Sequence, residues 1–239
     1  VLLAVARALD AAKVRTPGTI LFVGTVGEAG EGNLRGVRRL FAETLKAQVD
    51  YFLSVDGTGF GVTHRPVGSH RYKIAFVGPG GHSYGAFGMP NPAHALGRAV
   101  ARIADLEVTA SPKVTFSVSV LRGGQSVNSI PAEVSMDVDM RSEDAGALAD
   151  LDRRVRAAVD SAVRQERARW PRSQAALVAR IDTIGIRPAG GQADDAPIVR
   201  AAVAAARALG APSELSASST DANVPINLGI PALTIDGGG

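Results

Sequence analysis

Two carboxylates lie in a glycine-rich loop that follows a short apolar segment. The segment 19–26 is rich in β-branched and apolar residues, and Glu28 and Glu31 follow it among several glycines. Apolar residues then recur at helical spacing, so we predict a strand over 19–26, a loop, and a helix over 33–47. In an α/β protein such a loop lies at the carboxyl edge of the sheet, where ligands bind.

Two kinds of ligand could explain the glycines of this loop. Backbone N–H groups before a helix can bind a phosphate, but Glu28 and Glu31 would repel one. The spacing of Gly30, Gly32 and Gly36 also leaves three residues in the second gap, where the dinucleotide-binding fingerprint has two. Acid–base or metal chemistry by the carboxylates therefore fits better than a dinucleotide site, which stays open as an alternative.

Composition limits the classes of protein to consider. A chain of 239 residues, 46% hydrophobic and 21% charged, suggests a globular protein of one large or two modest domains. The net charge of +3 comes from dispersed arginines, and with few aromatic residues it argues against a nucleic-acid partner. The absence of cysteine excludes disulfides, thiolate zinc sites and a cysteine nucleophile. Short apolar runs and no signal-peptide pattern predict a cytoplasmic protein without a membrane partner.

Residues 1–66 and 187–239 carry the pattern of an α/β domain. We predict helices over 2–14 and 195–209 and further strands over 50–57, 213–216 and 231–235. The chain begins inside its first helix without a capping residue. The β-α-β order of residues 19–57 implies parallel strands. Glu28 and Asp56, each following a strand, should then lie at the same edge of the sheet.

Residues 67–186 carry a different pattern. Strands are expected over 69–77, 113–122, 132–141 and 175–186, with helices over 91–105 and 145–169. This β-α-β-β-α-β order is the ferredoxin-like arrangement. Apolar and polar residues alternate in the central strands, so one sheet face should pack on the helices and the other should face solvent or a partner. We read 67–186 as an inserted domain.

The glycine-rich loop resembles that of a known enzyme family. Residues 25–36 are similar to the Glu-Glu loop of the zinc-dependent amidohydrolases and exopeptidases that include aminoacylase, acetylornithine deacetylase, succinyl-diaminopimelate desuccinylase and glutamate carboxypeptidase. In that family the first Glu is the general base and the second binds zinc. Glu28 matches the first, whereas Ala29 stands at the second, and a methyl group cannot bind a metal. The resemblance implies an α/β, parallel-strand catalytic-type domain (1–66 plus 187–239) with an inserted ferredoxin-like lid and dimerisation domain (67–186).

The resemblance assigns roles to further residues in family order. Asp56 matches a zinc-binding carboxylate, and a strand-terminal Asp that caps a turn is the alternative. His82, in Gly80-Gly-His-Ser83, matches the histidine that stabilises the oxyanion in the partner subunit's site, and is otherwise a surface histidine. Asn128 matches the residue that binds the substrate carboxylate from the neighbouring subunit, with an Asx turn before Pro131 as the alternative.

Two more matches concern the substrate. Arg141 ends a strand, as does the family's arginine that clamps a substrate carboxylate, a task suited to a planar guanidinium. Residues 219–223 resemble the loop lining the substrate pocket, with Thr220 and Asp221 as the expected contacts. The resemblance also implies a homodimer formed through the inserted domain.

The family's two-zinc site is incomplete in this sequence. The family's His-x-Asp motif and bridging Asp would precede the first helix, and its last histidine would follow the final Gly-rich segment. His64 and His70 are expected to be structural. Since a zinc site needs three or four ligands, Asp56 alone should not hold the ion tightly.

We therefore expect a metal-dependent hydrolase, a peptidase or deacylase, for small peptides or N-acyl amino acids with a free carboxylate. This chain itself, truncated at both ends relative to the family, is expected to be inactive or impaired. A non-catalytic relative that acts as a dimeric binding or scaffold module is the alternative.

Overall fold

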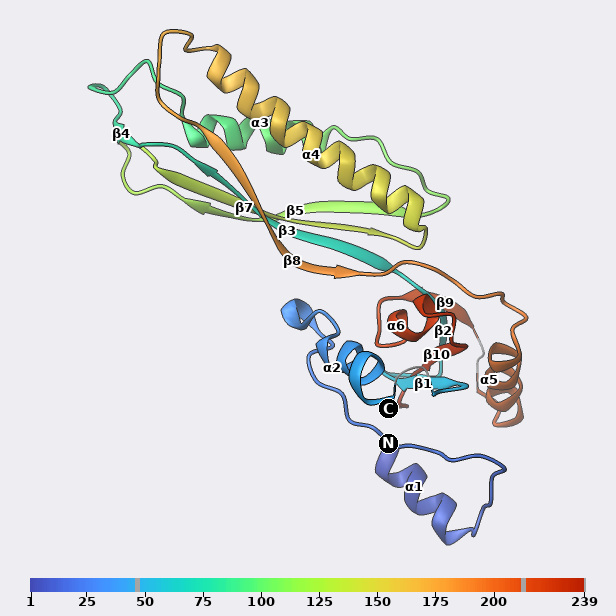
Figure 1. Cartoon of the computed structure of the whole chain (residues 1–239). Coiled ribbons are helices and arrows are strands. Elements are labelled where there is room, and N and C mark those ends of the chain that lie inside the picture. Colours follow the sequence, from blue (N-terminus) through green and yellow to red (C-terminus); the bar gives the residue numbers. More distant parts are fainter. Residues whose placement is uncertain (46–47, 212–213, 239) are drawn as a thin grey trace. The chain divides into compact units, whose positions relative to one another are not determined.

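The computed structural model describes residues 1–45, 48–211 and 214–238. The chain forms two compact units (Figure 1): unit 1 comprises Val1–Val67 and Arg187–Gly239, and unit 2 comprises Gly68–Ile186. Each unit has its own sheet. Among the described residues, no helix combines the length and the apolar character needed to cross a lipid bilayer.

Unit 2 has the ferredoxin-like arrangement that its sequence predicts. Its sheet has the strand order β5-β7-β3-β8, and a small second sheet pairs β4 with β6. Helices α3 and α4 lie side by side on one face of the larger sheet (Figure 1). The elements, in chain order, are β3 (Gly68–Val77), β4 (Gly81–His82), α3 (Pro92–Ala104), β5 (Val114–Gly123), β6 (Ser129–Ile130), β7 (Glu133–Ser142), α4 (Ala145–Ala168) and β8 (Val178–Arg187).

Local signals explain why unit 2 folds as expected. Asn91 caps α3 by accepting a hydrogen bond from Ala93 N at 2.9 Å, and Asp144 caps α4 by accepting one from Ala147 N at 2.6 Å. Alternating residues of the two central strands are fully or almost fully buried against the helices: Tyr72, Ile74, Phe76, Met136, Val138 and Met140. The opposite face of these strands is polar.

Unit 1 contains a four-stranded mixed sheet of order β1-β10-β2-β9. Strand β1 is parallel to β10, and β2 is parallel to β9 but antiparallel to β10. Strand β2 is not among the strands that the sequence predicts. The elements are α1 (Leu2–Ala11), η1 (Gly30–Gly32), α2 (Arg35–Arg39), its π-helical continuation η2 (Leu40–Thr44), β1 (Phe52–Val55), β2 (Val62–Pro66), α5 (Pro197–Ala208), β9 (Leu215–Ser218), α6 (Asn223–Asn227) and β10 (Ala232–Ile235).

Two small clusters form the core of unit 1. One brings the helix after the glycine-rich loop against α6 and contains Leu34, Val37, Phe41, Val224 and Ile230. The other packs α5 on the sheet through Val62, Val199 and Leu233. The predicted helix over 33–47 and strand over 213–216 extend in part over residues outside those described.

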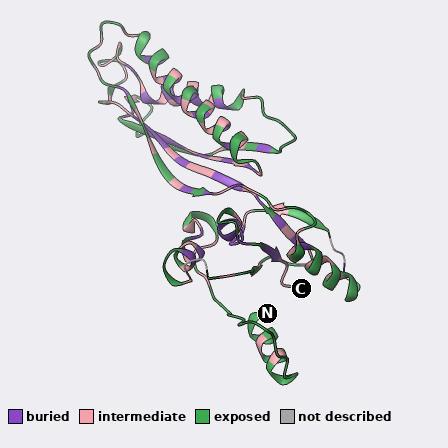
Figure 2. Ribbon diagram, turned by 45° about the vertical axis from the view of Figure 1, so that its right-hand side comes forward, coloured by how far each residue is buried: buried purple, intermediate pink, exposed green. Residues whose placement is uncertain are grey.

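The predicted strand over 19–26 is wrong. These residues form neither helix nor strand, and Ile20, Leu21 and Phe22 are 43–60% exposed. A strand is stable only when a neighbour satisfies its backbone groups, and within the described residues no strand pairs with this segment. The β-α-β unit expected over residues 19–57 is therefore not formed. Helix α1 exists as predicted but buries no residue, as the exposed ribbon in Figure 2 shows.

Candidate functional site

The glycines of the loop around Glu28 allow the backbone to fold closely upon itself. A Cβ on Gly32 would lie 2.4 Å from the carbonyl oxygen of Gly27, and a Cβ on Gly36 would lie 2.5 Å from backbone atoms of Val26. The N–H of Gly36 donates to the carbonyl of Val26 at 2.9 Å. These contacts explain the glycine spacing by packing. They leave Glu28 with its side chain 30% exposed.

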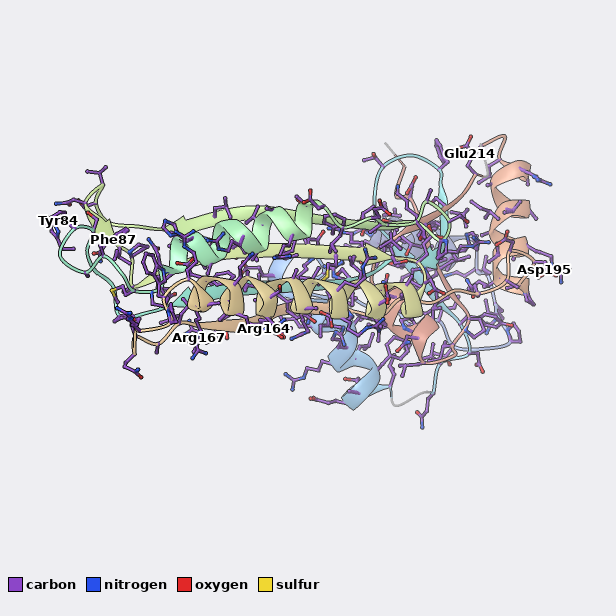
Figure 3. All side chains as sticks on the ribbon, turned by 90° about the horizontal axis from the view of Figure 1, so that it is seen from above. Tyr84, Phe87, Arg164, Arg167, Asp195 and Glu214 are labelled. Carbon is purple, nitrogen blue, oxygen red and sulfur yellow. The ribbon has the colours of Figure 1, made fainter. Side chains whose placement is uncertain are left out.

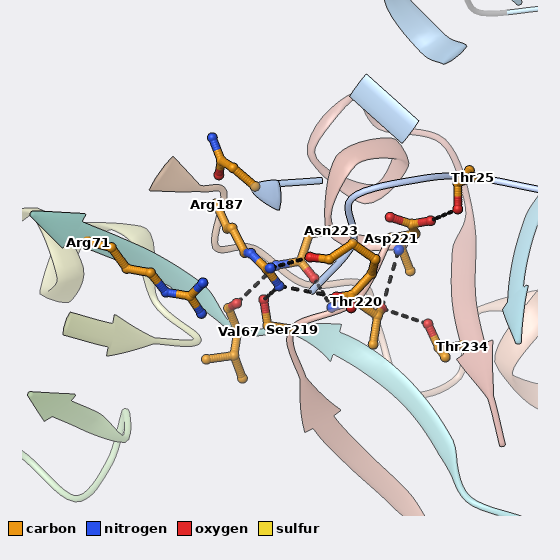
Figure 4. A network of polar contacts seen from close by, with 12 residues as sticks. Thr25, Val67, Arg71, Arg187, Ser219, Thr220, Asp221, Asn223 and Thr234 are labelled. Carbon is orange, nitrogen blue, oxygen red and sulfur yellow. Dashed lines mark hydrogen bonds and ion pairs between the residues drawn. The ribbon is translucent and has the colours of Figure 1, made fainter. Parts of the chain in front are cut away.

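Arg187 lies against Glu28. Its Nη1 is 3.2 Å from Oε1 of Glu28, and its Nη2 donates to the carbonyl of Glu28. The same Nη1 is 3.0 Å from Oγ of Ser219 (Figure 4). The Arg187 side chain is only 4% exposed. Arg187 is not among the residues that the sequence predicts for this site. A charged residue inside a Pro- and Gly-rich turn is the signal that could have identified it.

A second carboxylate approaches the same loop from the other end of unit 1. Asp221 is buried, and its Oδ2 accepts a hydrogen bond from the hydroxyl of Thr25, which lies just before the loop (Figure 4). Its Oδ1 is also buried and has no hydrogen-bond partner among the described residues. Such an atom is uncommon in proteins and marks a place where a ligand or water could bind.

Asp56 belongs to the same electrostatic group. Burial raises the pKa of Glu28, Arg187 opposes the rise, and the charges of Asp56 and Asp221 add to it. Burial also raises the pKa of Asp221, with the Thr25 hydrogen bond opposing and the charge of Asp56 adding. Asp56 itself is exposed after β1, and its N–H donates to the carbonyl of Ile235 at 3.0 Å. Three carboxylates far apart in the sequence thus lie close enough in unit 1 to perturb one another.

Thr220 and Asn223 hold the loop that carries Asp221. The Thr220 hydroxyl lies 2.7 Å from that of Thr234, and its N–H donates to Oδ1 of Asn223 at 2.8 Å. The Asn223 amide donates to the carbonyls of Val67 and Pro188, the two places where the chain leaves and re-enters unit 1. Asn223, which sequence reasoning did not single out, therefore has a structural role. The expected contact of Thr220 with substrate stays a prediction.

The described residues do not fit a tightly bound zinc ion. Among them, no group of three or more His, Cys, Asp or Glu side chains is arranged to hold a metal. Ala29 adds no donor beside Glu28. His64 is buried on β2, where its Nε2 lies 2.8 Å from Oδ1 of Asp194. Hydrogen bonds from His64 and Arg65 lower the pKa of Asp194, so His64 pairs with a carboxylate of its own unit.

In unit 2, His82 and Asn128 are neighbours. His82 pairs with Ser129 between β4 and β6, and the N–H of Ser83 donates to the carbonyl of Asn128 at 2.9 Å. Both residues are exposed. The structure thus brings together two residues that the resemblance assigns to the same function, a neighbouring subunit's site.

Backbone hydrogen bonds determine which nitrogen of the neutral His82 ring carries the proton. Its Nδ1 accepts hydrogen bonds from the N–H groups of Tyr84 and Gly85 at 3.3 and 3.4 Å. An accepting Nδ1 leaves the proton of a neutral imidazole on Nε2. The free nitrogen is therefore a hydrogen-bond donor. Tyr84 and Phe87 on the same loop are 89% and 78% exposed and stand at one end of unit 2 in Figure 3.

A buried glutamate anchors the loop that carries His82. Glu166 of α4 is fully buried and accepts hydrogen bonds from Asn91 N at 3.1 Å and Trp170 Nε1 at 3.2 Å. Arg98 of α3 supplies the compensating charge at 3.1 Å. Phe87 packs edge-on against Trp170, with ring centroids 5.3 Å apart. This network joins the end of the loop to both helices.

Arg141 lies at the other end of the sheet of unit 2. It pairs in register with Ser69 near the start of β3, whereas Val77 at the end of β3 pairs with Glu133. The distance from Glu133 to Arg141 along β7 is about 26 Å at the usual rise per residue. Because His82 and Asn128 lie beyond the Val77 end, Arg141 and Asn128 of one chain do not meet.

An apolar cavity of about 370 Å³ lies between α5 and the sheet of unit 1. Its lining includes Leu53, Val62, Ala202 and Leu233, and it contains none of the predicted site residues. The carboxylate group around Glu28, and not this cavity, is therefore the candidate site of unit 1.

Known proteins share this architecture. The whole chain resembles a tripeptidase from Staphylococcus aureus (18% identity, TM-score 0.80, covering 98% of this chain and 60% of the tripeptidase). It also resembles the aminopeptidase PepT from Bacillus cereus (20% identity, TM-score 0.73, covering 96% of this chain and 59% of PepT). An amidase of the hydantoinase/carbamoylase family from Burkholderia vietnamiensis is similar over less of the chain (22% identity, TM-score 0.60, covering 79% of this chain and 46% of the amidase).

These similarities establish the fold. The chain spans about 60% of the tripeptidase and of PepT, and no curated protein matches its sequence significantly. Residues 66–167, however, match a family directly, that of the M20 peptidase dimerisation domain. The chain therefore has the α/β fold of these peptidases and amidases, and residues 66–167, most of its inserted unit, are similar to peptidase dimerisation domains.

Proposed function

We propose that the chain is built for hydrolysis of an amide bond next to a free carboxylate, in a small peptide or an N-acyl amino acid. The observation that carries this proposal is the convergence of Glu28, Asp56 and Asp221 in unit 1. The peptidase dimerisation domain match and the names of the similar structures support the reaction class.

Glu28 is the general base in this proposal. Its raised pKa makes its carboxylate a better proton acceptor than an exposed glutamate. It takes a proton from the attacking water and transfers it to the leaving amine. Arg187, hydrogen-bonded to both the side chain and the carbonyl of Glu28, keeps that carboxylate in place. In the same proposal, Thr220 and Asp221 of the loop 219–223 contact the substrate, and Asp56 is the candidate metal ligand.

The dimerisation domain supplies the other half of the site in a homodimer. His82 donates its Nε2 proton to the developing oxyanion of the partner's substrate. Asn128, from the neighbouring subunit, and Arg141 hold the substrate carboxylate in this proposal. Asn128 lies beyond the Val77 end of β3, whereas Arg141 lies at the other end of the sheet, and this separation supports taking the two residues from different subunits.

We further propose that this chain is inactive or severely impaired as it stands. The chemistry that zinc would supply in such a site is polarisation of the scissile carbonyl and activation of water. Its ligands would be Asp56 and the residue at position 29, but Ala29 offers none, and the described residues gather no set of three donors. The lack of such a set of donors also favours a second candidate function, that of a binding module. A dimeric binding module would retain the substrate pocket and the dimer without turnover.

Hydrolysis of tripeptides and N-acetyl amino acids, assayed with and without added zinc, tests both candidates. We expect slow turnover at best, and any turnover should fall about 10²- to 10⁴-fold in Glu28→Gln. Turnover that persists in Glu28→Gln would refute the role of Glu28. Binding of the same compounds without turnover would favour the binding module.

A further inference from the structure

Arg141 belongs to a group of three charged residues on the polar face of the sheet of unit 2. Asp139 stands directly opposite Arg71 between β7 and β3, and Arg141 follows on the same face of β7. Oδ1 of Asp139 accepts from Nε of Arg71 at 2.9 Å, and Oδ2 accepts from Nε of Arg141 at 2.6 Å. Each carboxylate oxygen therefore holds a different arginine.

This arrangement fixes the direction of the Arg141 side chain. The bond to Asp139 uses Nε–H, and among the described residues neither terminal nitrogen of Arg141 has a hydrogen-bond partner. Those two nitrogens form the planar fork that binds a carboxylate bidentately. Asp139 cannot turn away from Arg141 without also losing Arg71, whose side chain is only 16% exposed. The fork is therefore held ready, 42% exposed, before any ligand arrives.

We infer that Asp139, itself anchored by Arg71, is a positioning residue that aims Arg141 at the carboxylate of the substrate. This inference rests on the carboxylate-binding role of Arg141 in the proposed function. The group of two arginines and one aspartate has a net charge of +1, which matches a single carboxylate. Holding the guanidinium beforehand also lowers the entropy lost on binding.

If Asp139 acted only through its charge, removing that charge would change the affinity for a carboxylate in the opposite direction. A negative charge beside Arg141 weakens attraction for an anion, so removing it should strengthen carboxylate binding. If Asp139 positions Arg141, removing its charge should weaken binding. An Asn at 139 has one acceptor oxygen for two arginines, and its amide group would face an N–H donor.

Asp137 provides a matched control on the same strand and face. It lies opposite Lys73, and its Oδ2 is 2.8 Å from Nη1 of Arg122. Asp137→Asn therefore removes the same charge from the same face without touching Arg141. The probe is N-acetyl-L-alanine, titrated by NMR into the full chain while the Nε–H resonances of the arginines are observed.

We expect Asp139→Asn to weaken binding about tenfold, the effect of one charge-assisted hydrogen bond. Asp137→Asn should bind as tightly as the unmodified chain or more tightly. Asp139→Glu keeps the charge but displaces the acceptor, so its affinity should also fall, whereas an electrostatic role predicts no change. The Nε–H resonance of Arg141 should shift in Asp139→Asn and stay in place in Asp137→Asn.

The experiment distinguishes a wrong role for Asp139 from a wrong role for Arg141. Binding that is lost in Arg141→Gln but retained in both Asp139 variants would overturn the positioning role alone. Binding that is unaffected by Arg141→Gln, or absent in the unmodified chain, would overturn the carboxylate role of Arg141 and the inference with it. Folding of each variant is checked by the fluorescence of Trp170, which lies in unit 2.

Discussion

Units 1 and 2 differ in how many of the strands expected from the sequence have a hydrogen-bonded neighbour and a covered apolar face. In unit 2, every predicted strand has a hydrogen-bonded neighbour, and the apolar face of the sheet is covered by α3 and α4. In unit 1, the apolar segment 19–26 has no strand partner among the described residues, and α1 buries none of its residues. A pattern of apolar residues thus specifies a strand only when another strand pairs with it, whereas the helix α1 forms without burying any of its residues.

A matched pair of phenylalanines tests this difference with the largest expected effect. Phe76 in β3 is fully buried, whereas Phe22 in the segment 19–26 is 43% exposed. Phe76→Ala should lower the free energy of unfolding by about 3–5 kcal/mol, because it leaves a cavity in a packed core. Phe22→Ala should change it by less than about 1 kcal/mol. Urea unfolding followed by circular dichroism measures both, and similar losses would contradict the comparison.

A substitution of Glu166 tests how much the hydrogen bonds and the ion pair of this buried carboxylate stabilise unit 2. Glu166→Ala leaves Arg98 without its partner and frees the N–H of Asn91, so we expect a loss of about 3 kcal/mol. The fluorescence of Trp170, the only tryptophan, reports this unfolding directly. Asp160→Ala, an exposed acid on the same helix, is the control and should have little effect. Equal stability of the two variants would show that the network contributes nothing.

The contrast also explains what the sequence could predict. The strands and helices of unit 2 follow from strict alternation and from the caps Asn91 and Asp144, all of which act locally. The carboxylates Glu28 and Asp56 were expected at one edge because each follows an apolar run. The charge of Asp56 acts on the pKa of Glu28, but the strand at 19–26 that was to place Glu28 at that edge is not formed.

Arg187 and Asn223 could not be predicted in the same way. Their roles depend on contacts across more than a hundred residues of chain, to Glu28 and to Val67. No local periodicity records such contacts. The same holds for Arg71, whose partner Asp139 is set by the register of two strands. Turn-like sequence around Arg187 concealed a buried charge.

Arg187→Met tests how far unit 1 depends on this one buried cation. Without it, Glu28 faces Asp56 and Asp221 with no compensating charge, and Ser219 loses a donor. We expect a loss of about 2 kcal/mol, because the partial exposure of Glu28 lets water replace some of the interaction. Thermal unfolding at neutral pH checks this value. An unchanged midpoint would mean that the three carboxylates do not need Arg187.

Asp221→Asn should have the smallest effect and the opposite sign. Burial raises the pKa of Asp221, so the folded chain binds its proton more tightly than the unfolded chain. The cost of ionising Asp221 is therefore absent below the unfolded pKa and present in full above the folded pKa. The variant should be more stable by about 1 kcal/mol at pH 7 and no more stable at about pH 3. A gain that persists at the lower pH would contradict this cause.

The metal content of the purified chain tests the central claim most directly. Unit 1 gathers a general base and two further carboxylates, but the described residues do not gather a zinc site. After incubation with excess zinc and desalting, elemental analysis should find far less than stoichiometric zinc, and Ala29→Glu alone should not restore it. Stoichiometric zinc in the unmodified chain would contradict the account, because it would require a ligand set that Asp56 and its neighbours do not supply.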